Sequence, residues 1–391
     1  MRMDRSPKVR HAPERRSELV RRITIRLRPF HSLRWPGGDD FGTMLWLKLK
    51  SIDIRLLGAI AVAVGTLIAL AIPKPVQDPA PSRVARCERG THIVSFAFSP
   101  TSAHIATTND SGRVALRAAE NGWQIERFLD FPGFARELAF SPDGGTLGVV
   151  GTASKMCFWD LRSRGSEPTQ TMMAPVQQPK CFAFSPDGQC VAVTSFLDGT
   201  ILLLDLATRR KRMVLHQRSP IASIAFSPDR KWLATGAADN RSIQLWNLRS
   251  GSSRSLEEGE TNGVSMALAF SPDGALLASA GFPEHHVSLW DLQSGRVCRL
   301  FEGHSRSVTS LAFSVDGSLL ATVGNDGTLG LWTVATGVRR LSLNGNAAWL
   351  QTVAFSPDGQ TLALATGNDD DIRFWNLAEL LRPQRGSRPR R

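Results

Sequence analysis

The sequence predicts an all-β fold of seven small antiparallel sheets, preceded by one membrane-spanning helix. Two observations lead to this prediction. An apolar residue followed by Ala-Phe-Ser occurs seven times, at intervals of 42 to 44 residues, and a run of 17 uncharged residues extends from Leu56 to Ile72. The interval suits four short strands with their turns, and the uncharged run just reaches the length of a membrane span.

The chain begins with a basic segment, residues 1–54, that we expect to be disordered and cytoplasmic. This segment is rich in Arg, Pro and Gly and shows no sustained hydrophobic period. Residues 1–55 contain 14 Lys and Arg against 6 Asp and Glu, whereas Lys74 and Asp78 cancel just after the apolar run. Because cytoplasmic flanks are enriched in Lys and Arg, the N-terminus is expected in the cytoplasm and the body of the chain across the membrane.

The apolar run is interpreted as an uncleaved signal anchor over residues 55–73. A cleaved export signal is the alternative, since Ala69-Leu70-Ala71 matches a small-x-small cleavage pattern and a start at Met44 leaves a short basic leader. A buried soluble helix is less consistent with a run that is apolar on every side. Residues 74–82 form a Pro-rich linker after the span.

Net charge does not indicate a nucleic-acid-binding protein. The formal charge is +12, but residues 56–378 contain 28 basic and 28 acidic residues. The excess lies at the two ends, including the tail 379–391 with five Arg and one Glu. A neutral body argues against a basic scaffold for nucleic acid, so no nucleic-acid partner is expected.

Each Ala-Phe-Ser is usually followed by Pro-Asp-Gly, which predicts a hairpin turn. Pro presets φ, Asp bonds to its own backbone and Gly accepts a positive φ. The repeated Phe residues are Phe98, Phe140, Phe184, Phe226, Phe270, Phe313 and Phe355. A short apolar strand precedes each turn and another follows it, as in residues 361–366.

Two more strands complete each unit. The third, as in 372–377, contains a landmark residue 19 or 20 positions after the Phe, and the fourth is more polar, as in 339–343. That landmark is Trp in five units: Trp159, Trp246, Trp290, Trp332 and Trp375. One such sheet cannot bury both of its faces, but seven arranged radially can, with Phe and Trp filling the wedges between neighbours.

These motifs resemble the WD repeat, over residues 83–378. The Trp-Asp pair stands at Trp159-Asp160 and Trp290-Asp291, and Gly303-His304 is the one Gly-His pair. The resemblance implies a seven-bladed β-propeller of four-stranded antiparallel blades, and the AFSPDG form of the repeat is similar to bacterial members. It also implies a buried polar tetrad in one blade, whose members are His304, Thr322, Asp326 and Trp332.

Four positions depart from the pattern. Arg117 and Leu204 replace Trp in the first and third units, which predicts looser packing there. Val315 replaces Pro in the sixth turn and Arg230 replaces Gly in the fourth, without a change of spacing.

Closure of the ring is a separate prediction, because the chain contains no fourth strand after Leu377. Residues 83–92, RVARCERGTH, align with residues 295–304, GRVCRLFEGH, which form a fourth strand leading into its turn. This segment is therefore expected to complete the seventh sheet.

No catalytic motif is found, so we expect no enzymatic activity and no cofactor. The turn Asp residues recur because the turn requires them, and neither 369–371 nor His285-His286 is expected to hold a metal. Cysteines are expected to be free and buried, including Cys181, Cys190, Cys87 and Cys298.

Partner binding is assigned to the face formed by the loops between fourth and first strands and between second and third strands. Aromatic, Met and His side chains in these loops suit a protein-binding surface. They are Phe131, Phe134, Met172, Met173, His216, Phe282 and Trp349. The opposite face repeats Ser-Pro-Asp-Gly and is expected to offer nearly the same polar surface around the ring.

The resulting hypothesis is a membrane-anchored, noncatalytic scaffold that binds one or more proteins through the loop face. The setting expected is a bacterial inner membrane, with the N-terminus in the cytoplasm and the propeller in the periplasm. The alternative is an exported propeller enzyme or a ligand-binding sensor that uses the central channel.

Overall fold

The computed structural model describes residues 78–86, 92–152, 154–174, 176–239, 242–256, 264–345, 350–367 and 371–382. The basic segment 1–54, the expected membrane helix 55–73 and residues 383–391 of the tail lie outside these ranges. Among the helices of the described part, none is both long and apolar enough to cross a membrane.

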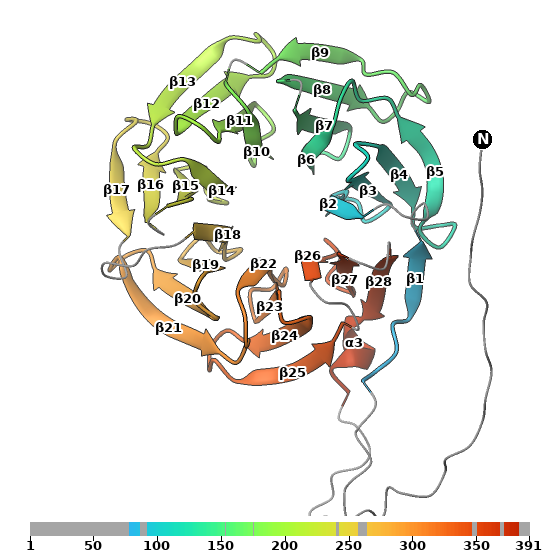
Figure 1. Ribbon diagram of the computed structural model, residues 1–391, viewed down its shortest axis with the longest axis vertical. Coiled ribbons are helices and arrows are strands. Elements are labelled where there is room, and N and C mark those ends of the chain that lie inside the picture. The colour runs from blue at the N-terminus through green and yellow to red at the C-terminus, as the bar shows by residue number, and fades with distance from the viewer. Residues whose placement is uncertain are drawn as a thin grey trace, which may run out of the picture. The chain divides into compact units, whose positions relative to one another are not determined.

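Within the described residues, the strands form seven sheets, each with four antiparallel strands. The sheets follow one another around a ring, with the first strand of each nearest the centre and the fourth at the rim (Figure 1). The predicted all-β, seven-bladed propeller is therefore confirmed.

Six sheets are built from four consecutive strands. The first contains β2 (Ile93–Phe98), β3 (His104–Asn109), β4 (Val114–Ala118) and β5 (Gln124–Leu129). The second contains β6 (Ala135–Phe140), β7 (Thr146–Gly151), β8 (Lys155–Asp160) and β9 (Gln170–Met173). The third contains β10 (Pro179–Phe184), β11 (Cys190–Ser195), β12 (Thr200–Asp205) and β13 (Lys211–His216).

The same order continues through the next three sheets. The fourth contains β14 (Ile221–Phe226), β15 (Trp232–Ala237), β16 (Ile243–Asn247) and β17 (Ser253–Leu256). The fifth contains β18 (Val264–Phe270), β19 (Leu276–Phe282), β20 (His286–Asp291) and β21 (Arg296–Glu302). The sixth contains β22 (Val308–Phe313), β23 (Leu319–Gly324), β24 (Thr328–Thr333) and β25 (Arg339–Asn344).

The seventh sheet joins the two ends of the propeller. It contains β26 (Leu350–Phe355), β27 (Thr361–Thr366), β28 (Asp371–Asn376) and, as its outer strand, β1 (Arg83–Arg86). β1 pairs with β28 in antiparallel register, with Arg83 opposite Phe374 and Arg86 opposite Asp371. The predicted closure is confirmed for this strand, whereas residues 87–91 lie outside the described part.

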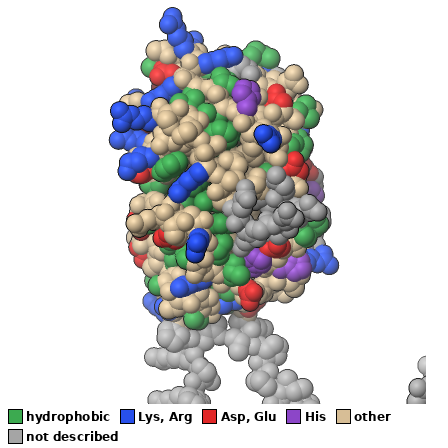
Figure 2. All heavy atoms as spheres, turned by 90° about the vertical axis from the view of Figure 1, so that its left-hand side faces the viewer, with side chains coloured by type: hydrophobic (Ala, Val, Ile, Leu, Met, Phe, Trp, Pro, Cys, Tyr) green, Lys and Arg blue, Asp and Glu red, His purple; other side chains and the backbone are tan. Residues whose placement is uncertain are grey.

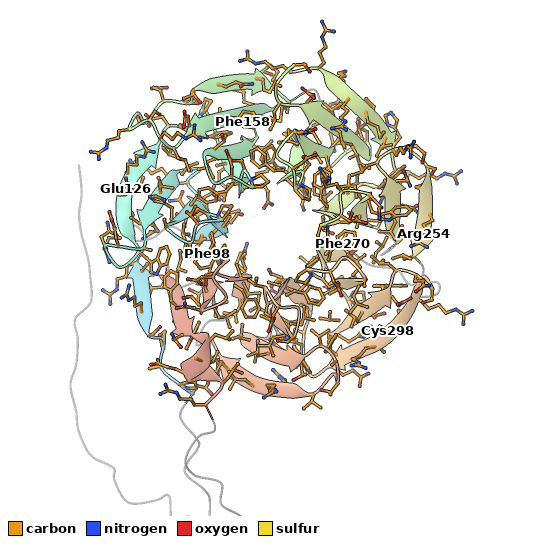
Figure 3. The ribbon with its side chains drawn as sticks, turned by 180° about the vertical axis from the view of Figure 1, so that it is seen from behind. Phe98, Glu126, Phe158, Arg254, Phe270 and Cys298 are labelled. Carbon is orange, nitrogen blue, oxygen red and sulfur yellow. The ribbon has the colours of Figure 1, made fainter. Side chains whose placement is uncertain are left out.

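Side chains fill the wedges between neighbouring sheets. Seven buried clusters are found among the described residues, and each combines side chains of two adjacent sheets. Where the seventh sheet meets the first, the Trp123 and Phe374 rings stack with centroids 5.2 Å apart. Figure 3 shows Phe98 and Phe270 toward the centre of the ring and Glu126, Arg254 and Cys298 at its rim.

The repeated turn is held by a side-chain network. In the second sheet, the Ser141 hydroxyl donates to the Asp143 carboxylate at 2.5 Å and accepts the Thr146 N–H at 2.9 Å. Asp143 also accepts the N–H of Gly145, and these hydrogen bonds lower its pKa below the usual range. The third to seventh sheets repeat the pattern. The first sheet has Thr101 at the Asp position, and its hydroxyl pairs with Ser99 at 3.1 Å and accepts the N–H of Ala103 at 3.4 Å, so the network is kept without the carboxylate.

The chain after β28 forms one short helical turn that was not predicted. α3 (Leu377–Leu380) begins where the Asn376 side chain accepts the N–H of Glu379 at 3.0 Å. Leu380 packs against the seventh sheet, so the start of the predicted tail belongs to the propeller.

We expect ring closure to depend on the buried face of β1. Ala85 is fully buried and Val84 is 40% exposed, although the two are neighbours in the strand. Ala85→Asp places an unpaired carboxylate in the wedge between the seventh and first sheets and should lower the free energy of unfolding by about 3 kcal/mol. Chemical denaturation of the full chain measures this effect.

Val84→Asp is the matched control, because it adds the same charge to the same strand on its exposed side. It should change the free energy of unfolding by less than about 1 kcal/mol. Equal losses for the two variants would show that β1 is not packed into the ring.

Candidate functional site

Four side chains of the sixth sheet form one hydrogen-bonded network. His304 Nε2 lies 2.7 Å from the Thr322 hydroxyl, which also accepts the Trp332 indole N–H at 2.8 Å. His304 Nδ1 lies 3.0 Å from the Asp326 carboxylate. The structure thus joins the four residues expected from the resemblance.

The charge of Asp326 is stabilised within this network. Burial raises its pKa, but hydrogen bonds from His304 and from the backbone N–H of Ser305 outweigh burial and lower the pKa below its usual range. The network fixes the chain segment that leads into β22, so its role is to position the sheet.

The loop-face residues lie at one end of several sheets. Phe131 and Phe134 are in the connection from β5 to β6, and Met173, His216 and Phe282 end β9, β13 and β19. Met172 lies inside β9, a rim strand, and not in a loop as predicted. Trp349 lies outside the described residues.

The structure does not gather these side chains into a single pocket. Phe131 and Met172 pack against the wedge clusters of their own sheets. Phe282 is 56% exposed and Met173 is 63% exposed, and they belong to the fifth and second sheets. The loop face therefore offers separate apolar contacts, of which Phe282 and Met173 are the most accessible.

Three neighbouring inner strands bring together polar side chains that the sequence did not single out. The Ser95 hydroxyl on β2 donates to the Glu137 carboxylate on β6 at 3.3 Å. Burial raises the pKa of Glu137 to about 7, and the Ser95 hydrogen bond and the charge of Lys180 on β10 offset this only in part. Nothing in the local sequence marks Glu137, because its environment depends on the two adjacent sheets.

Across the described residues, no three His, Cys, Asp or Glu side chains are grouped in a way that could hold a metal ion. His286 Nε2 lies 2.7 Å from the Glu284 carboxylate. The cysteines Cys157, Cys181 and Cys190 are free and buried, whereas Cys298 is exposed. The prediction of burial was wrong for Cys298 because it lies on β21, a rim strand. Cys87 and Asp369-Asp370 lie outside the described residues.

A family comparison matches the same repeat. The family described as "WD domain, G-beta repeat" matches residues 166–205, 209–247, 252–291, 295–333 and 337–376, which together are half of the chain. The chain belongs to the WD40-repeat family. Each matched stretch extends from the fourth strand of one sheet to the third strand of the next. The first sheet and the first three strands of the second lie before the matched stretches. The structure shows that these two sheets have the same four-stranded form as the others.

Curated relatives share parts of the propeller. A nuclear distribution protein PAC1 of Arthroderma otae is 31% identical over 170 residues, which are 41% of this chain and 36% of the relative. A WD repeat-containing protein of Synechocystis is 29% identical over 161 residues, 41% of this chain and 45% of the relative. The Groucho protein of Drosophila melanogaster is 33% identical over 140 residues, 34% of this chain and 18% of the relative. The chain spans less than half the length of each of these relatives.

Other sheets of this WD40 propeller use different partners for the Trp indole. In the fourth sheet, Gln217 occupies the His position, and its side-chain oxygen accepts the Thr235 hydroxyl at 2.5 Å. Thr235 in turn accepts the Trp246 indole N–H at 2.9 Å. An amide therefore replaces the imidazole in this sheet.

Arg117 replaces the Trp of the first sheet and is 1% exposed. Its guanidinium donates to the carbonyl of Trp123 and to that of Arg86, which lies on the closing strand β1, both at 3.1 Å. Leu204, in the third sheet, is 4% exposed. Both positions are thus filled without Trp, and the looser packing expected there stays a prediction.

Glu137 should make the stability of the propeller depend on pH. Its folded pKa is about 7 against an ordinary value of 4.5, so the folded protein holds the proton on Glu137 more tightly than the unfolded chain does. The contribution of Glu137 to folding stability is therefore fully present below pH 4.5 and is lost as the pH rises to about 7. Glu137→Gln, which stays neutral, should raise the free energy of unfolding at pH 8 by at most about 3 kcal/mol and have little effect near pH 4.5. Urea denaturation at the two pH values measures the difference.

Glu302→Gln is the control, because Glu302 is exposed on β21. It should behave like the wild type at both pH values. A gain for Glu137→Gln that is equal at pH 4.5 and pH 8 would show that ionisation of Glu137 is not the cause.

Proposed function

We propose that this WD40-repeat protein is a membrane-anchored, noncatalytic scaffold for protein–protein interaction. The observation that carries the proposal is the pair of large apolar side chains, Phe282 and Met173, exposed on the loop face of a rigid ring. Exposed aromatic and Met side chains are typical anchors of protein interfaces. The WD40 relatives support the same broad role for this chain.

The partner is expected to bind through the loop face because this face varies around the ring. Its loops and strand ends carry Phe131, Phe134, His216 and Phe282 in positions outside the repeated turn. A partner that contacts several of these separate groups is selected by their spacing, since no single pocket gathers them.

The proposed place of the propeller follows from the segment before it. Residues 55–73 are long enough to anchor the chain, and the basic residues before them favour a cytoplasmic N-terminus. The AFSPDG repeats and the Synechocystis relative favour a bacterial setting. The anchor then holds the propeller on the periplasmic side of an inner membrane.

Phe282→Ala should weaken capture of the partner. Loss of a central aromatic anchor costs about 2 kcal/mol of binding, which is roughly thirtyfold in affinity. The full-length protein would be isolated from native membranes with its bound proteins, and the recovery of each would be compared between wild type, Phe282→Ala and Met173→Ala.

Val338→Ala provides the control on the opposite face. Val338 is 60% exposed in the turn between β24 and β25. Partners retained by both loop-face variants but lost with Val338→Ala would contradict the assignment of faces. Absence of any specifically recovered protein would contradict the scaffold function itself.

Topology can be measured independently. Protease added to intact spheroplasts should digest or release the propeller and leave residues 1–50 intact. Complete protection of the propeller, with digestion only after the membrane is opened, would reverse the proposed orientation.

A further inference from the structure

A pocket of about 430 Å³ lies between the third and fourth sheets, on the hairpin-turn face. It is formed by the first turn of each sheet, by the start of β13 and by the turn that leads to β17. Three arginines line it: Arg212, Arg230 and Arg249. It faces away from the loop face and is therefore a separate surface.

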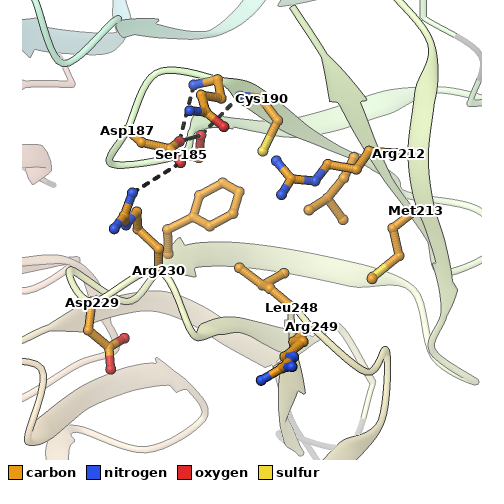
Figure 4. Close-up of a pocket in the computed structure, with 12 residues that line it drawn as sticks. Ser185, Asp187, Cys190, Arg212, Met213, Asp229, Arg230, Leu248 and Arg249 are labelled. Atoms are coloured by element: carbon orange, nitrogen blue, oxygen red, sulfur yellow. Dashed lines mark hydrogen bonds and ion pairs between the residues drawn. The ribbon is translucent and has the colours of Figure 1, made fainter.

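Two of the three guanidinium groups form no direct ion pair in the described part of the chain, although the charge of Arg212, after hydrogen bonds from Thr208, helps to lower the pKa of Asp205. Arg230 pairs with Asp187 at 3.5 Å, in an exposed position. Among the described residues, neither Arg212 nor Arg249 forms an ion pair with a carboxylate. Figure 4 shows the Arg212 guanidinium pointing into the pocket toward Cys190, while Arg249 lies at its lower edge.

Apolar side chains form the rest of the lining. Phe226, Met213 and Leu248 are partly buried, and Leu203 behind them is buried. A ligand in this pocket can therefore place carbon against carbon while its charged end reaches an arginine. This combination suits a peptide in which an apolar side chain is next to the carboxylate of an Asp or Glu.

The next pocket along the same face has the opposite character. It lies between the second and third sheets, has a volume of about 650 Å³ and is lined by Asp143, Asp187 and Asp205 but by no Lys or Arg. The expectation of nearly the same polar surface around the turn face was therefore wrong. The turn motif fixes the backbone, but the residues beside it differ from sheet to sheet.

The basic character comes from two short sequence features. Arg230 occupies the position where five of the other turns have Gly, and residues 209–212, Arg-Arg-Lys-Arg, cover the end of the β12–β13 connection and the first two residues of β13. In Figure 2, which shows the molecule from the side of β13 and β17, Lys and Arg side chains are concentrated toward one face of the ring. The pocket thus lies within a wider positive surface that attracts anionic partners.

We propose that this pocket binds an acidic segment of a protein partner, in which Asp or Glu alternates with apolar residues. Guanidinium groups bind carboxylates with two parallel hydrogen bonds, and the apolar lining accepts the intervening side chains. A nucleic-acid backbone fits less well, because Asp187 and Asp229 line the same pocket and repel a continuous row of phosphates.

The test uses the full-length protein in detergent micelles and a fluorescent heptapeptide of alternating Glu and Leu. Fluorescence anisotropy should show binding that weakens as salt is raised, and a peptide of alternating Gln and Leu should bind at least about tenfold more weakly. Arg212→Glu and Arg249→Glu should each reduce affinity for the Glu-Leu peptide by roughly tenfold or more.

Arg164→Glu is the matched control, because Arg164, like Arg249, is exposed between the third and fourth strands of its sheet and the change in net charge is the same. It should leave the affinity nearly unchanged. An equal loss with Arg164→Glu, or no difference between the Glu-Leu and Gln-Leu peptides, would overturn the proposal. Displacement of the peptide by single-stranded RNA or by anionic lipid vesicles at lower concentration than by unlabelled peptide would also overturn it.

Phe282→Ala separates this proposal from the loop-face function. The variant should bind the Glu-Leu peptide as the wild type does, since Phe282 is on the opposite face. Loss of partner capture with Phe282→Ala and loss of peptide binding with Arg212→Glu are therefore independent results.

Discussion

Pairing of β1 with β28 is the interaction on which the rest of the propeller depends. Each sheet has two faces to bury, and in a ring both are covered only if the last sheet packs against the first. The closing strand supplies four paired positions from Arg83 to Arg86. Its neighbours add the Trp375 indole bond to the Pro79 carbonyl and the Asp78 bond to the Asn344 N–H. The segment that leads into the propeller therefore also closes the ring.

Arg117 shows how the first sheet is tied to this closure. A Trp at this position would fill a wedge and donate one hydrogen bond, whereas a guanidinium can donate several. Arg117 uses them on the carbonyls of Trp123 and Arg86, while the Trp123 ring stacks on Phe374 of the last sheet. The departure from the repeat thus occurs where two distant parts of the chain meet, and it serves a contact that no other sheet needs.

The periodic part of the fold could be predicted from the sequence, because each repeat contains the residues that determine its own turn and its own length. Ser-Pro-Asp-Gly specifies a turn wherever it occurs, and the interval between Phe313 and Phe355 sets the length of one sheet. Glu137 could not be identified in this way, since its raised pKa depends on burial between strands that are 42 or more residues apart in the chain. Gln217 was missed for a similar reason: it bonds to Thr235 only after the sheet has formed.

The candidate sites lie at positions that vary from sheet to sheet, whereas the positions that repeat maintain the fold. Ser141 and one carboxylate oxygen of Asp143 are occupied by the turn's own hydrogen bonds, so these side chains serve the turn first. Arg212 and Phe282, in contrast, lie just outside the repeated motif on rigid strands and face solvent or a pocket. A propeller of this kind can change the chemistry of its surface at such positions without loss of folding, because the hydrogen bonds and packed wedges that hold the ring involve other side chains. Two opposite faces that carry different exposed side chains, Phe282 on one and Arg212 on the other, are therefore compatible with a single stable ring.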